Sequence, residues 1–349
     1  MHDIITIGSA AKDIFLQGIN FVNCKSGDFK TGKGICLGLA SKNNVSEADL
    51  FNGGSAVNTA VTFSRQGLKT GAIFRIGDDL FGKDILDFLK KEKIDTSLHQ
   101  KDKEIGTALS VILLSNGERT ILDYKGAGRN INEKQIPWSK IKTKWFFVGT
   151  LSGNKKLLEK IFSAVNSAKI KLAGNPSLAD LKILKANPKL LKNYDVFLLN
   201  QEEASYLTGV PYQKPARNAS HSEAGGEKEI FKKLDKLVDG IVVMTKGVKG
   251  VSVSDGRNIY RAGIFPQKAY DRTGAGDAFG SGFVSGLLKA KSSCLAGRQA
   301  KLKAGDIEYA ICLGLANAAG VVEKIGANTG ILTKRDFEKE RRWESYIIN

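Results

Sequence analysis

The stretch at residues 271–288, DRTGAGDAFGSGFVSGLL, contains the residues best suited to chemistry. Gly274 and Gly276 permit a tight turn, because glycine adopts backbone angles that other residues avoid. The apolar residues after this turn recur every four positions, which predicts that a helix begins here. The backbone N–H groups of Gly274, Ala275 and Gly276 would then lie at a helix N-terminus, where they attract anions. A phosphoryl group in transfer carries its charge on oxygens, so such a turn suits phosphoryl transfer.

Asp277 lies in the first turn of this predicted helix. One interpretation is structural, because free N–H groups at a helix start stabilise a nearby carboxylate. The other is catalytic, with the carboxylate taking a proton from an attacking hydroxyl group. Glycine-rich turns followed by an acid are common, so the residue types alone leave both interpretations open.

Strands and helices alternate along the chain, which predicts the structure that positions this turn. Apolar runs typical of strands buried on both faces cover 4–8, 71–77, 145–149, 171–175, 196–200 and 241–245. Helical stretches cover 56–66, 81–92, 157–168, 202–208 and 227–237. This alternation predicts an α/β fold with a mostly parallel central sheet and helices on both faces. The crossovers of such a fold bring the carboxyl ends of the strands to one edge, where ligands bind.

Two segments interrupt the alternation, and we predict that they form a small β lid beside the sheet. Residues 14–50 lack a long amphipathic helix, and residues 105–125 contain two β runs joined by Asn-Gly, a strong hairpin signal. The predicted core comprises 1–13, 51–104 and 126–340, the lid comprises 14–50 and 105–125, and 341–349 form a C-terminal tail. Polar insertions are predicted at 213–228 and 290–305.

The chain of 349 residues carries a formal charge of +17. Nucleic-acid binding is one interpretation of this excess. The lysines are spread over many helical stretches and do not interleave with aromatic residues as in a stacking platform. We therefore interpret the charge as a lysine-rich surface that favours anionic substrates such as nucleotides, and expect no nucleic-acid partner.

No segment of the sequence predicts a membrane or zinc-binding protein. No uncharged apolar run reaches the roughly 18 residues that a membrane helix needs, and the N-terminal MHDIITIGSA lacks the basic region of a signal peptide. The four cysteines form no C-x-x-C pair, which favours reduced thiols over a zinc site. We expect a cytoplasmic protein without membrane contact.

The turn before Asp277 resembles the C-terminal signature of the ribokinase-like (phosphofructokinase-B-type) carbohydrate kinase family. Further stretches match this family in order from about residue 4 to 331. They are Gly8 with Asp13, Gly53-Gly54-Ser55-Ala56-Val57-Asn58-Thr59, Gly67, Gly77-Asp78-Asp79 with Gly82, Asn200-Gln201-Glu202-Glu203, Thr245-Lys246-Gly247 with Gly250, and Asn317 with Gly326-Ala327. The resemblance implies a three-layer α/β/α sandwich with a small β lid. It also implies an ATP-dependent kinase acting on a sugar or nucleoside hydroxyl.

The resemblance assigns roles to residues at both ends of the predicted cleft. Asp277 becomes the general base, and the turn of Gly274, Ala275 and Gly276 becomes the anion hole. Asp13, which we place just past the first strand, should grip two substrate hydroxyls, since a carboxylate accepts from paired donors. The residues implied to bind substrate with it are Gly53, Gly54 and Asn58. Loop capping by Asp13 and a local hydrogen bond of Asn58 are the structural alternatives.

A second group of residues is implied to hold the nucleotide and metal ions. Thr245, Lys246, Gly247 and Gly250 resemble the nucleotide loop, and Asn317 the adenine-side segment. Asn200 and Glu203 are implied to bind Mg²⁺ through water, which suits an ion that takes few protein ligands. The alternative for Glu203 is a first-turn acid favoured by the helix dipole, and the two roles are compatible. Asp271, Thr273 and Gly326 resemble a monovalent-cation loop, which would take K⁺.

The substrate is the least determined part of the prediction. The motif at 53–59 resembles adenosine kinases, whereas other features match ribokinases and nucleoside kinases alike, so we expect a ribose-bearing substrate. The alternatives are a phosphosugar (fructose phosphate-type) kinase and a non-catalytic sugar- or nucleotide-binding protein on the same fold. An exposed lid edge is also predicted to permit a homodimer.

Overall fold

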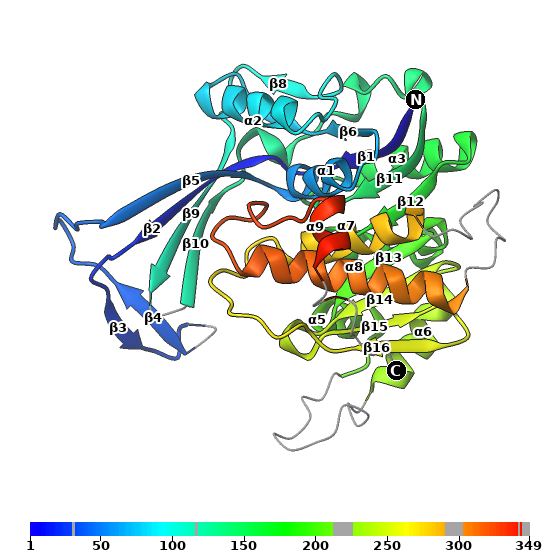
Figure 1. Ribbon diagram of the computed structural model, residues 1–349. Coiled ribbons are helices and arrows are strands. Elements are labelled where there is room, and N and C mark those ends of the chain that lie inside the picture. The colour runs from blue at the N-terminus through cyan, green and yellow to red at the C-terminus, as the bar shows by residue number, and fades with distance from the viewer. Residues whose placement is uncertain (30–31, 116–117, 212–225, 290–302, 341–342, 344–349) are drawn as a thin grey trace.

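The computed structural model describes residues 1–29, 32–115, 118–211, 226–289, 303–340 and 343. Figure 1 shows an α/β core from which a narrow β lid projects to one side. The predicted insertions at 213–228 and 290–305, the Asn-Gly turn of the lid and the 341–349 tail fall largely outside the described residues. The three-layer fold with its separate small sheet confirms the fold class predicted from the sequence.

The central sheet has eight strands in the order β16-β15-β14-β13-β12-β11-β1-β6. Six are parallel: β1 (His2–Ile7), β6 (Thr70–Ile73), β11 (Thr143–Val148), β12 (Lys171–Gly174), β13 (Val196–Asn200) and β14 (Ile241–Thr245). Two antiparallel strands, β15 (Val251–Ser254) and β16 (Ile259–Ala262), extend one edge. Neither of these was predicted. The parallel strands end together at the side that faces the lid.

The strand predicted at 71–77 is wrong in its second half. β6 ends at Ile73, and the chain then forms β7 (Arg75–Gly77), which leaves the central sheet. β7 pairs in parallel with β8 (Gln100–Asp102) in a separate sheet of two strands. Phe74 between them is fully buried, so the apolar run continues across a break in the strand. Periodicity alone therefore could not reveal this break.

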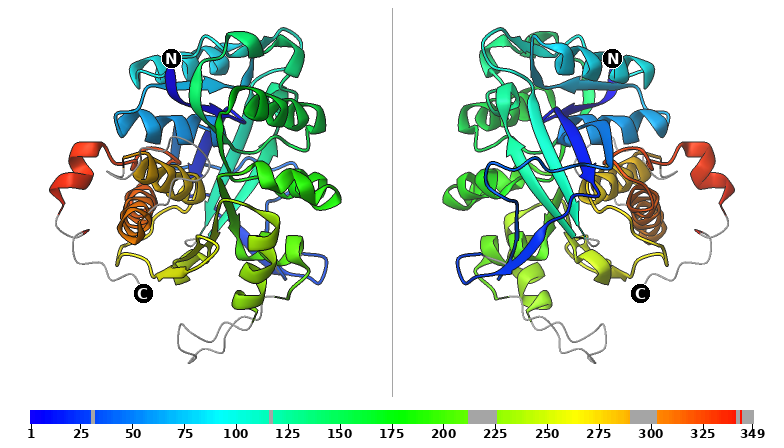
Figure 2. Two further views of the ribbon diagram at one scale, coloured as in Figure 1. Left: turned by 90° about the vertical axis from the view of Figure 1, so that its right-hand side faces the viewer. Right: turned by 90° about the vertical axis from the view of Figure 1, so that its left-hand side faces the viewer.

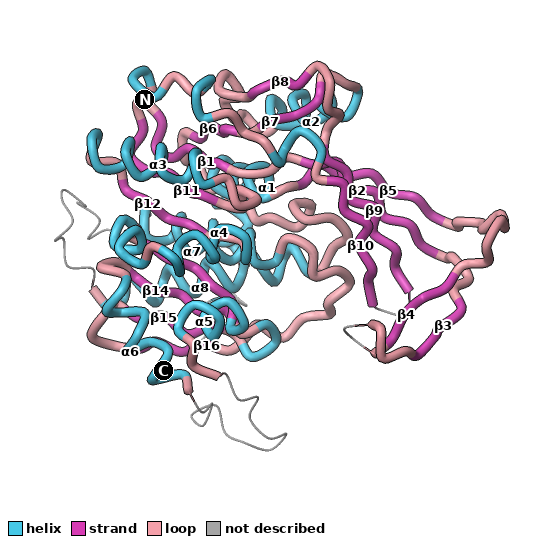
Figure 3. The backbone as a smooth tube through the Cα atoms, turned by 180° about the vertical axis from the view of Figure 1, so that it is seen from behind, coloured by secondary structure: helices cyan, strands magenta, loops and turns pink. Residues whose placement is uncertain are grey.

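Helices cover both faces of the central sheet, as Figures 1 and 3 show from opposite sides. One face carries α3 (Lys155–Ala168), α4 (Leu178–Ala186), α5 (Gln201–Thr208) and α6 (Glu227–Leu237). The other carries α1 (Ser55–Arg65), α7 (Ala275–Lys289) and α8 (Ala304–Val322), while α2 (Leu80–Lys91) and α9 (Lys334–Lys339) lie nearby. Short 3₁₀ turns lie at Gly126–Arg129, Glu133–Gln135, Trp138–Lys140, Pro188–Asn193 and Gly247–Lys249.

The helix α8 is apolar because it lies in the core. Its 19 residues would suffice to cross a bilayer, but 67% of its most apolar window is buried within the protein. Gly282 and Gly286 of α7 face this helix, and a Cβ atom at Gly286 would lie 2.5 Å from the Cα of Ala310. The close packing of α7 against α8 thus accounts for Gly282 and Gly286.

The lid is a sheet of four strands in the order β10-β9-β2-β5, and Figure 2 shows it from two opposite sides. The strands are β2 (Ala11–Gln17), β5 (Glu47–Gly53), β9 (Ala108–Ser115) and β10 (Glu118–Tyr124), and the hairpin of β3 (Val22–Lys25) and β4 (Lys33–Cys36) lies beyond them. Since β2 begins at Ala11, Asp13 lies inside a lid strand and not in a loop after the first strand. Apolar side chains of the lid, including Leu50 and Leu122, are exposed. They are compatible with the predicted homodimer, which stays a prediction.

Candidate active site

A cavity of about 210 Å³ lies where the lid meets the carboxyl ends of the core strands. Its lining includes Asp13 from the lid, Gly54 and Asn58 from the start of α1, and Gly274 and Asp277 from the start of α7. Thr273, just before α7, also lines it. More than 200 residues of chain separate the starts of α1 and α7, and the fold brings together six of the predicted site residues. Figure 1 shows the loops that enter α7 and leave α8 both reaching toward the lid.

The turn before α7 requires glycine at one position. Gly274 has a φ of 77°, in the left-handed region, and a Cβ atom there would lie 2.5 Å from the carbonyl oxygen of Ala327. The N–H of Ala278 donates to the Gly274 carbonyl at 2.8 Å, so the helical hydrogen bonds begin at this turn. The N–H groups at the start of α7 have no partner within the helix itself. The N–H of Ala275 donates to the carbonyl of Arg272 at 3.3 Å, and Thr273, Gly274 and Asp277 are the residues of this turn that line the cavity.

Asp277 is held by one side chain from across the cavity. The amide nitrogen of Asn58 donates to Oδ2 of Asp277 at 2.9 Å. Burial raises the pKa of the Asp277 carboxyl to about 6, although the hydrogen bond from Asn58 acts to lower it. Near neutral pH the group is therefore mostly an ionised base whose proton affinity exceeds that of an ordinary aspartate.

Asn58 is itself positioned by a residue that the sequence did not reveal. The side-chain amide of Asn328 donates to Oδ1 of Asn58 at 3.2 Å and to the backbone carbonyl of Asn52 at 2.5 Å. Asn58 is 4% exposed and so cannot rotate freely. This pairing leaves its amide nitrogen directed at Asp277. Asn328 directly follows the Gly326-Ala327 turn, which the resemblance included. This position was the only signal in the sequence that pointed to Asn328.

Asp13 forms the lid side of the cavity. It is 5% exposed, and burial raises its pKa to about 6 while the hydroxyl of Ser110 on the neighbouring strand acts to lower it. Asp271 and Asp123 raise this pKa further through their charge. Gly53 is required beside it, because a Cβ atom at Gly53 would lie 2.1 Å from Oδ2 of Asp13. Gly53 thus leaves space for the Asp13 carboxylate, although Gly53 is not itself among the residues that line the cavity.

The lid also contributes cavity residues that the sequence did not reveal. Ser110 comes from β9 and Asp123 from β10, and the turn after β10 supplies Lys125 and Arg129. Asp123 forms an ion pair with Lys125. The hairpin was predicted, but the β runs gave no indication of which face of the hairpin meets the core.

At the carboxyl ends of β13 and β14, Asn200 and Thr245 are register partners. Asn200 caps α5: its Oδ1 accepts from the N–H of Glu203 at 2.9 Å, and Oε2 of Glu203 accepts from the N–H of Asn200 at 2.7 Å. Burial raises the pKa of Glu203. Glu203 thus lies in the first turn of α5, as its structural alternative states, and the reciprocal capping with Asn200 is a further role that the sequence analysis did not predict. Their remaining oxygen and nitrogen atoms lie at the same sheet edge as the cavity.

Lys246, which the resemblance places in the nucleotide loop, is held by side chains of the protein in this structure. Its ammonium group donates to Ser252 at 2.7 Å and to Oε2 of Glu227 at 3.2 Å, and its side chain is 8% exposed. Glu227, the first residue of α6, also accepts from Arg261 at 2.8 Å. Lys246 therefore neutralises a buried glutamate. A partner 19 residues away was not visible in the sequence.

Asn317 and Gly250 also have structural roles that differ from their predicted contacts. Asn317 is 0% exposed, donates to the carbonyl of Ala278 at 2.8 Å and to Thr62 at 3.1 Å, and accepts from the N–H of Leu332. A side chain so enclosed cannot lie against adenine, so that prediction is wrong. At Gly250 a Cβ atom would lie 1.9 Å from a backbone carbonyl of β16, whereas Gly247 faces open space.

The predicted monovalent-cation loop is approached by an arginine of the lid. Arg119 on β10 donates to Oδ1 of Asp271 at 3.2 Å and to the hydroxyl of Thr273 at 2.7 Å. Asp271 also accepts from the N–H of Thr273 at 2.9 Å, and the N–H of Gly326 lies 3.4 Å from its other oxygen. A guanidinium thus already supplies positive charge at the two predicted side-chain ligands. The arrangement does not fit a cation bound to both of them.

Residues 33–334 match the pfkB family carbohydrate kinase profile, which covers most of the chain. The chain belongs to the pfkB family of carbohydrate kinases. It is therefore a phosphotransferase with a hydroxyl group as acceptor, as the sequence predicted.

Three relatives of this pfkB family kinase are named for different acceptors. The ribokinase of Haemophilus influenzae is 29% identical over 293 residues, which cover 81% of this chain and 85% of the relative. The 5-dehydro-2-deoxygluconokinase of Bacillus licheniformis is 28% identical, covering 83% and 86%. The cytidine kinase of Thermococcus kodakarensis is 26% identical, covering 78% and 88%.

Solved structures share the fold at lower identity. A ribokinase II from Escherichia coli in complex with ATP and Mg²⁺ superposes with a TM-score of 0.73 at 17% identity, covering 97% of this chain and 98% of that one. An Arabidopsis thaliana ribokinase in complex with ribose and ATP has a TM-score of 0.70 at 18% identity, with the same coverage. These similarities support the ribokinase fold.

Proposed function

We propose that this protein transfers the γ-phosphoryl group of ATP to a hydroxyl group of a sugar or nucleoside. The observation that carries the proposal is the position of Asp277. Its carboxylate shares one cavity with Asp13, Asn58 and the glycine turn of α7, between the lid and the strand ends. A base, a group that accepts hydrogen bonds from hydroxyls, and a turn of backbone donors are what transfer to an alcohol needs.

The residues divide the work by their chemistry. Asp13 accepts hydrogen bonds from substrate hydroxyls and orients the sugar ring, since a buried carboxylate prefers paired donors. Asp277 takes the proton of the reacting hydroxyl, and the hydrogen bond from Asn58 fixes the carboxylate during that step. The N–H groups of Gly274, Ala275 and Gly276 stabilise the negative charge on the transferred phosphoryl oxygens.

We assign ATP to the sheet edge beside this cavity, with Thr245 and Gly247 beside its phosphates or ribose. Asn200 and Glu203 offer oxygen ligands of the kind Mg²⁺ prefers, and their capping bonds leave room for contacts through water. Among the described residues no group of three or more His, Cys, Asp or Glu side chains gathers as a metal cage. This suits an ion held chiefly by phosphates and water, which would neutralise phosphate charge when bound.

The test is ADP release in the presence of ATP, Mg²⁺ and a panel of ribose, fructose, adenosine, cytidine and fructose 6-phosphate. We expect one compound to stimulate ADP release well above the rate without acceptor, with a phosphorylated product detected by mass spectrometry. ATP binding without turnover on any acceptor would instead indicate a non-catalytic binding protein. Activity on hexoses alone would exclude the ribose-bearing substrate predicted from the sequence.

A further inference from the structure

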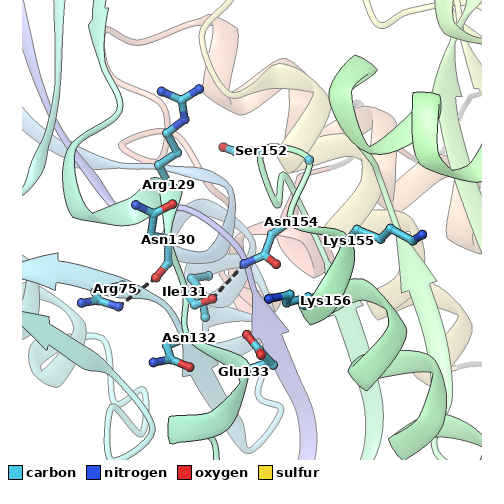
Figure 4. A pocket seen from close by; sticks show the side chains of 11 residues that line it. Arg75, Arg129, Asn130, Ile131, Asn132, Glu133, Ser152, Asn154, Lys155 and Lys156 are labelled. Carbon is cyan, nitrogen blue, oxygen red and sulfur yellow. Dashed lines mark hydrogen bonds between the residues drawn. The ribbon is translucent and has the colours of Figure 1, made fainter.

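A second cavity, of about 580 Å³, adjoins the substrate cavity. It is formed by the loops that follow the lid and β11, by the start of α3, and by Arg75 (Figure 4). The two cavities share Arg129 and Ser152 in their linings. A ligand that lies in the substrate cavity can therefore extend past these two residues into the second cavity, which we call the basic basin.

The basic basin carries four cationic side chains and one acidic side chain: Arg75, Arg129, Lys155, Lys156 and Glu133. Arg75 is used structurally, because its guanidinium donates to Asp102 at 2.7 Å and to the carbonyl of Asn130 at 2.9 Å. The nearest acidic partner of Lys155 is Glu159 at 3.8 Å, on the outer side of α3.

The other two cations remain available to a ligand. Within the described parts of the chain, no carboxylate lies within 4.0 Å of Arg129 or Lys156. Figure 4 shows the two side chains on different walls, Arg129 from the turn after the lid and Lys156 from the first turn of α3. α3 carries no acidic residue in its first turn to offset this charge.

The joined cavities are opposite in charge at their two ends. The substrate cavity contains the carboxylates of Asp13, Asp123 and Asp277, of which Asp123 is paired with Lys125. Asp13 and Asp277 form no ion pair among the described residues, and they suit neutral hydroxyl groups as donors. The basic basin holds Arg129 and Lys156, which have no acidic partner among the described residues and would attract an anion. A neutral pentose would use only the first of these environments.

We infer that the substrate carries an anionic group, a phosphate or a carboxylate, which binds in the basic basin at Arg129 and Lys156. The reacting hydroxyl then lies at Asp277, at the opposite end of the same molecule. The substrate class is accordingly a sugar phosphate or a sugar acid. This inference rests on the proposed function for the position of the hydroxyl, whereas the anion site itself can be tested without turnover.

The first experiment measures binding by calorimetry, without ATP, for matched pairs: fructose 6-phosphate with fructose, ribose 5-phosphate with ribose, and gluconate with glucose. We expect the anionic member of at least one pair to bind about tenfold to hundredfold more tightly, as one or two charge-assisted hydrogen bonds provide. The phosphate and carboxylate arms decide between the two sources of the anion. Equal binding within every pair would overturn the inference.

The second experiment assigns that preference to residues. Lys156→Ala and Arg129→Ala should each reduce the ratio of anionic to neutral affinity about tenfold, and Lys156→Arg should retain most of it. Lys182→Ala, an exposed lysine on α4 outside both cavities, is the matched control and should change nothing. An unchanged ratio in both basin variants would overturn the inference. A retained binding preference without phosphorylation of any acceptor would instead refute the proposed function and leave the anion site intact.

Discussion

Asp277→Asn should make the protein more stable while it removes the proposed base. The folded protein raises the pKa of this carboxyl from 3.8 to about 6, chiefly through burial. Each pKa unit corresponds to about 1.4 kcal/mol, so holding the charged group in the fold costs about 3 kcal/mol at neutral pH. Asparagine has nearly the same shape, can still accept from Asn58 through its oxygen, and carries no charge. We therefore expect the free energy of unfolding to rise by up to about 3 kcal/mol.

The dependence of this gain on pH follows from the direction of the shift. The unfolded chain ionises Asp277 near its ordinary pKa of 3.8, whereas the folded protein does so near 6. The charged group therefore destabilises the fold fully above about pH 6, progressively less between pH 6 and 4, and not at all below. The gain of the variant should follow the same course, because its side chain does not titrate.

Urea unfolding of both proteins at pH 5, 6, 7 and 8 measures this difference directly. Asp87→Asn, at an exposed position of α2, is the matched control and should change stability by less than about 0.5 kcal/mol at every pH. A variant at Asp277 that is less stable than the wild type at pH 8, or whose gain does not depend on pH, would refute the electrostatic reasoning.

Three further outcomes are expected. Turnover should fall about tenfold per pH unit below pH 6 as Asp277 is protonated, and a flat kcat profile from pH 8 to 5 would contradict this. Arg119→Ala should make activity depend on K⁺, because Asp271 loses its guanidinium partner. Rates measured in K⁺ and in tetramethylammonium buffers should therefore differ for the variant and agree for the wild type. Asn317→Ala should lower the free energy of unfolding by about 2–4 kcal/mol, since it leaves buried donors and acceptors unpaired, and urea unfolding measures that loss.

The sequence was most informative where a local motif determines the local structure. The strands at β13 and β14 and the helix α6 have the predicted bounds, because a short apolar run or an amphipathic stretch specifies each of them alone. The turn at Gly274 was predicted from glycine spacing, and its φ of 77° gives the physical reason. The resemblance placed Asn58 and Asp277 in the same site, but it did not predict the hydrogen bond between them.

The sequence could not reveal the contacts between side chains that lie far apart in the chain. Lys246 lies in a motif of the family, but its ammonium group is directed by Glu227 on another element. Asn317 becomes structural only when α8 packs against α7. The charge asymmetry of the two cavities arises because Arg129 and Lys156 line the same cavity from different elements, and no spacing in the chain indicates this.

The base assignment is tested most directly by the rate of phosphoryl transfer in Asp277→Asn, measured under single-turnover conditions with saturating ATP and the acceptor found by the panel. Our account predicts a rate about 10²–10⁴-fold below wild type, with the Kd for ATP changed by less than about twofold. A rate within about threefold of wild type, in a folded variant that binds ATP normally, would contradict the account.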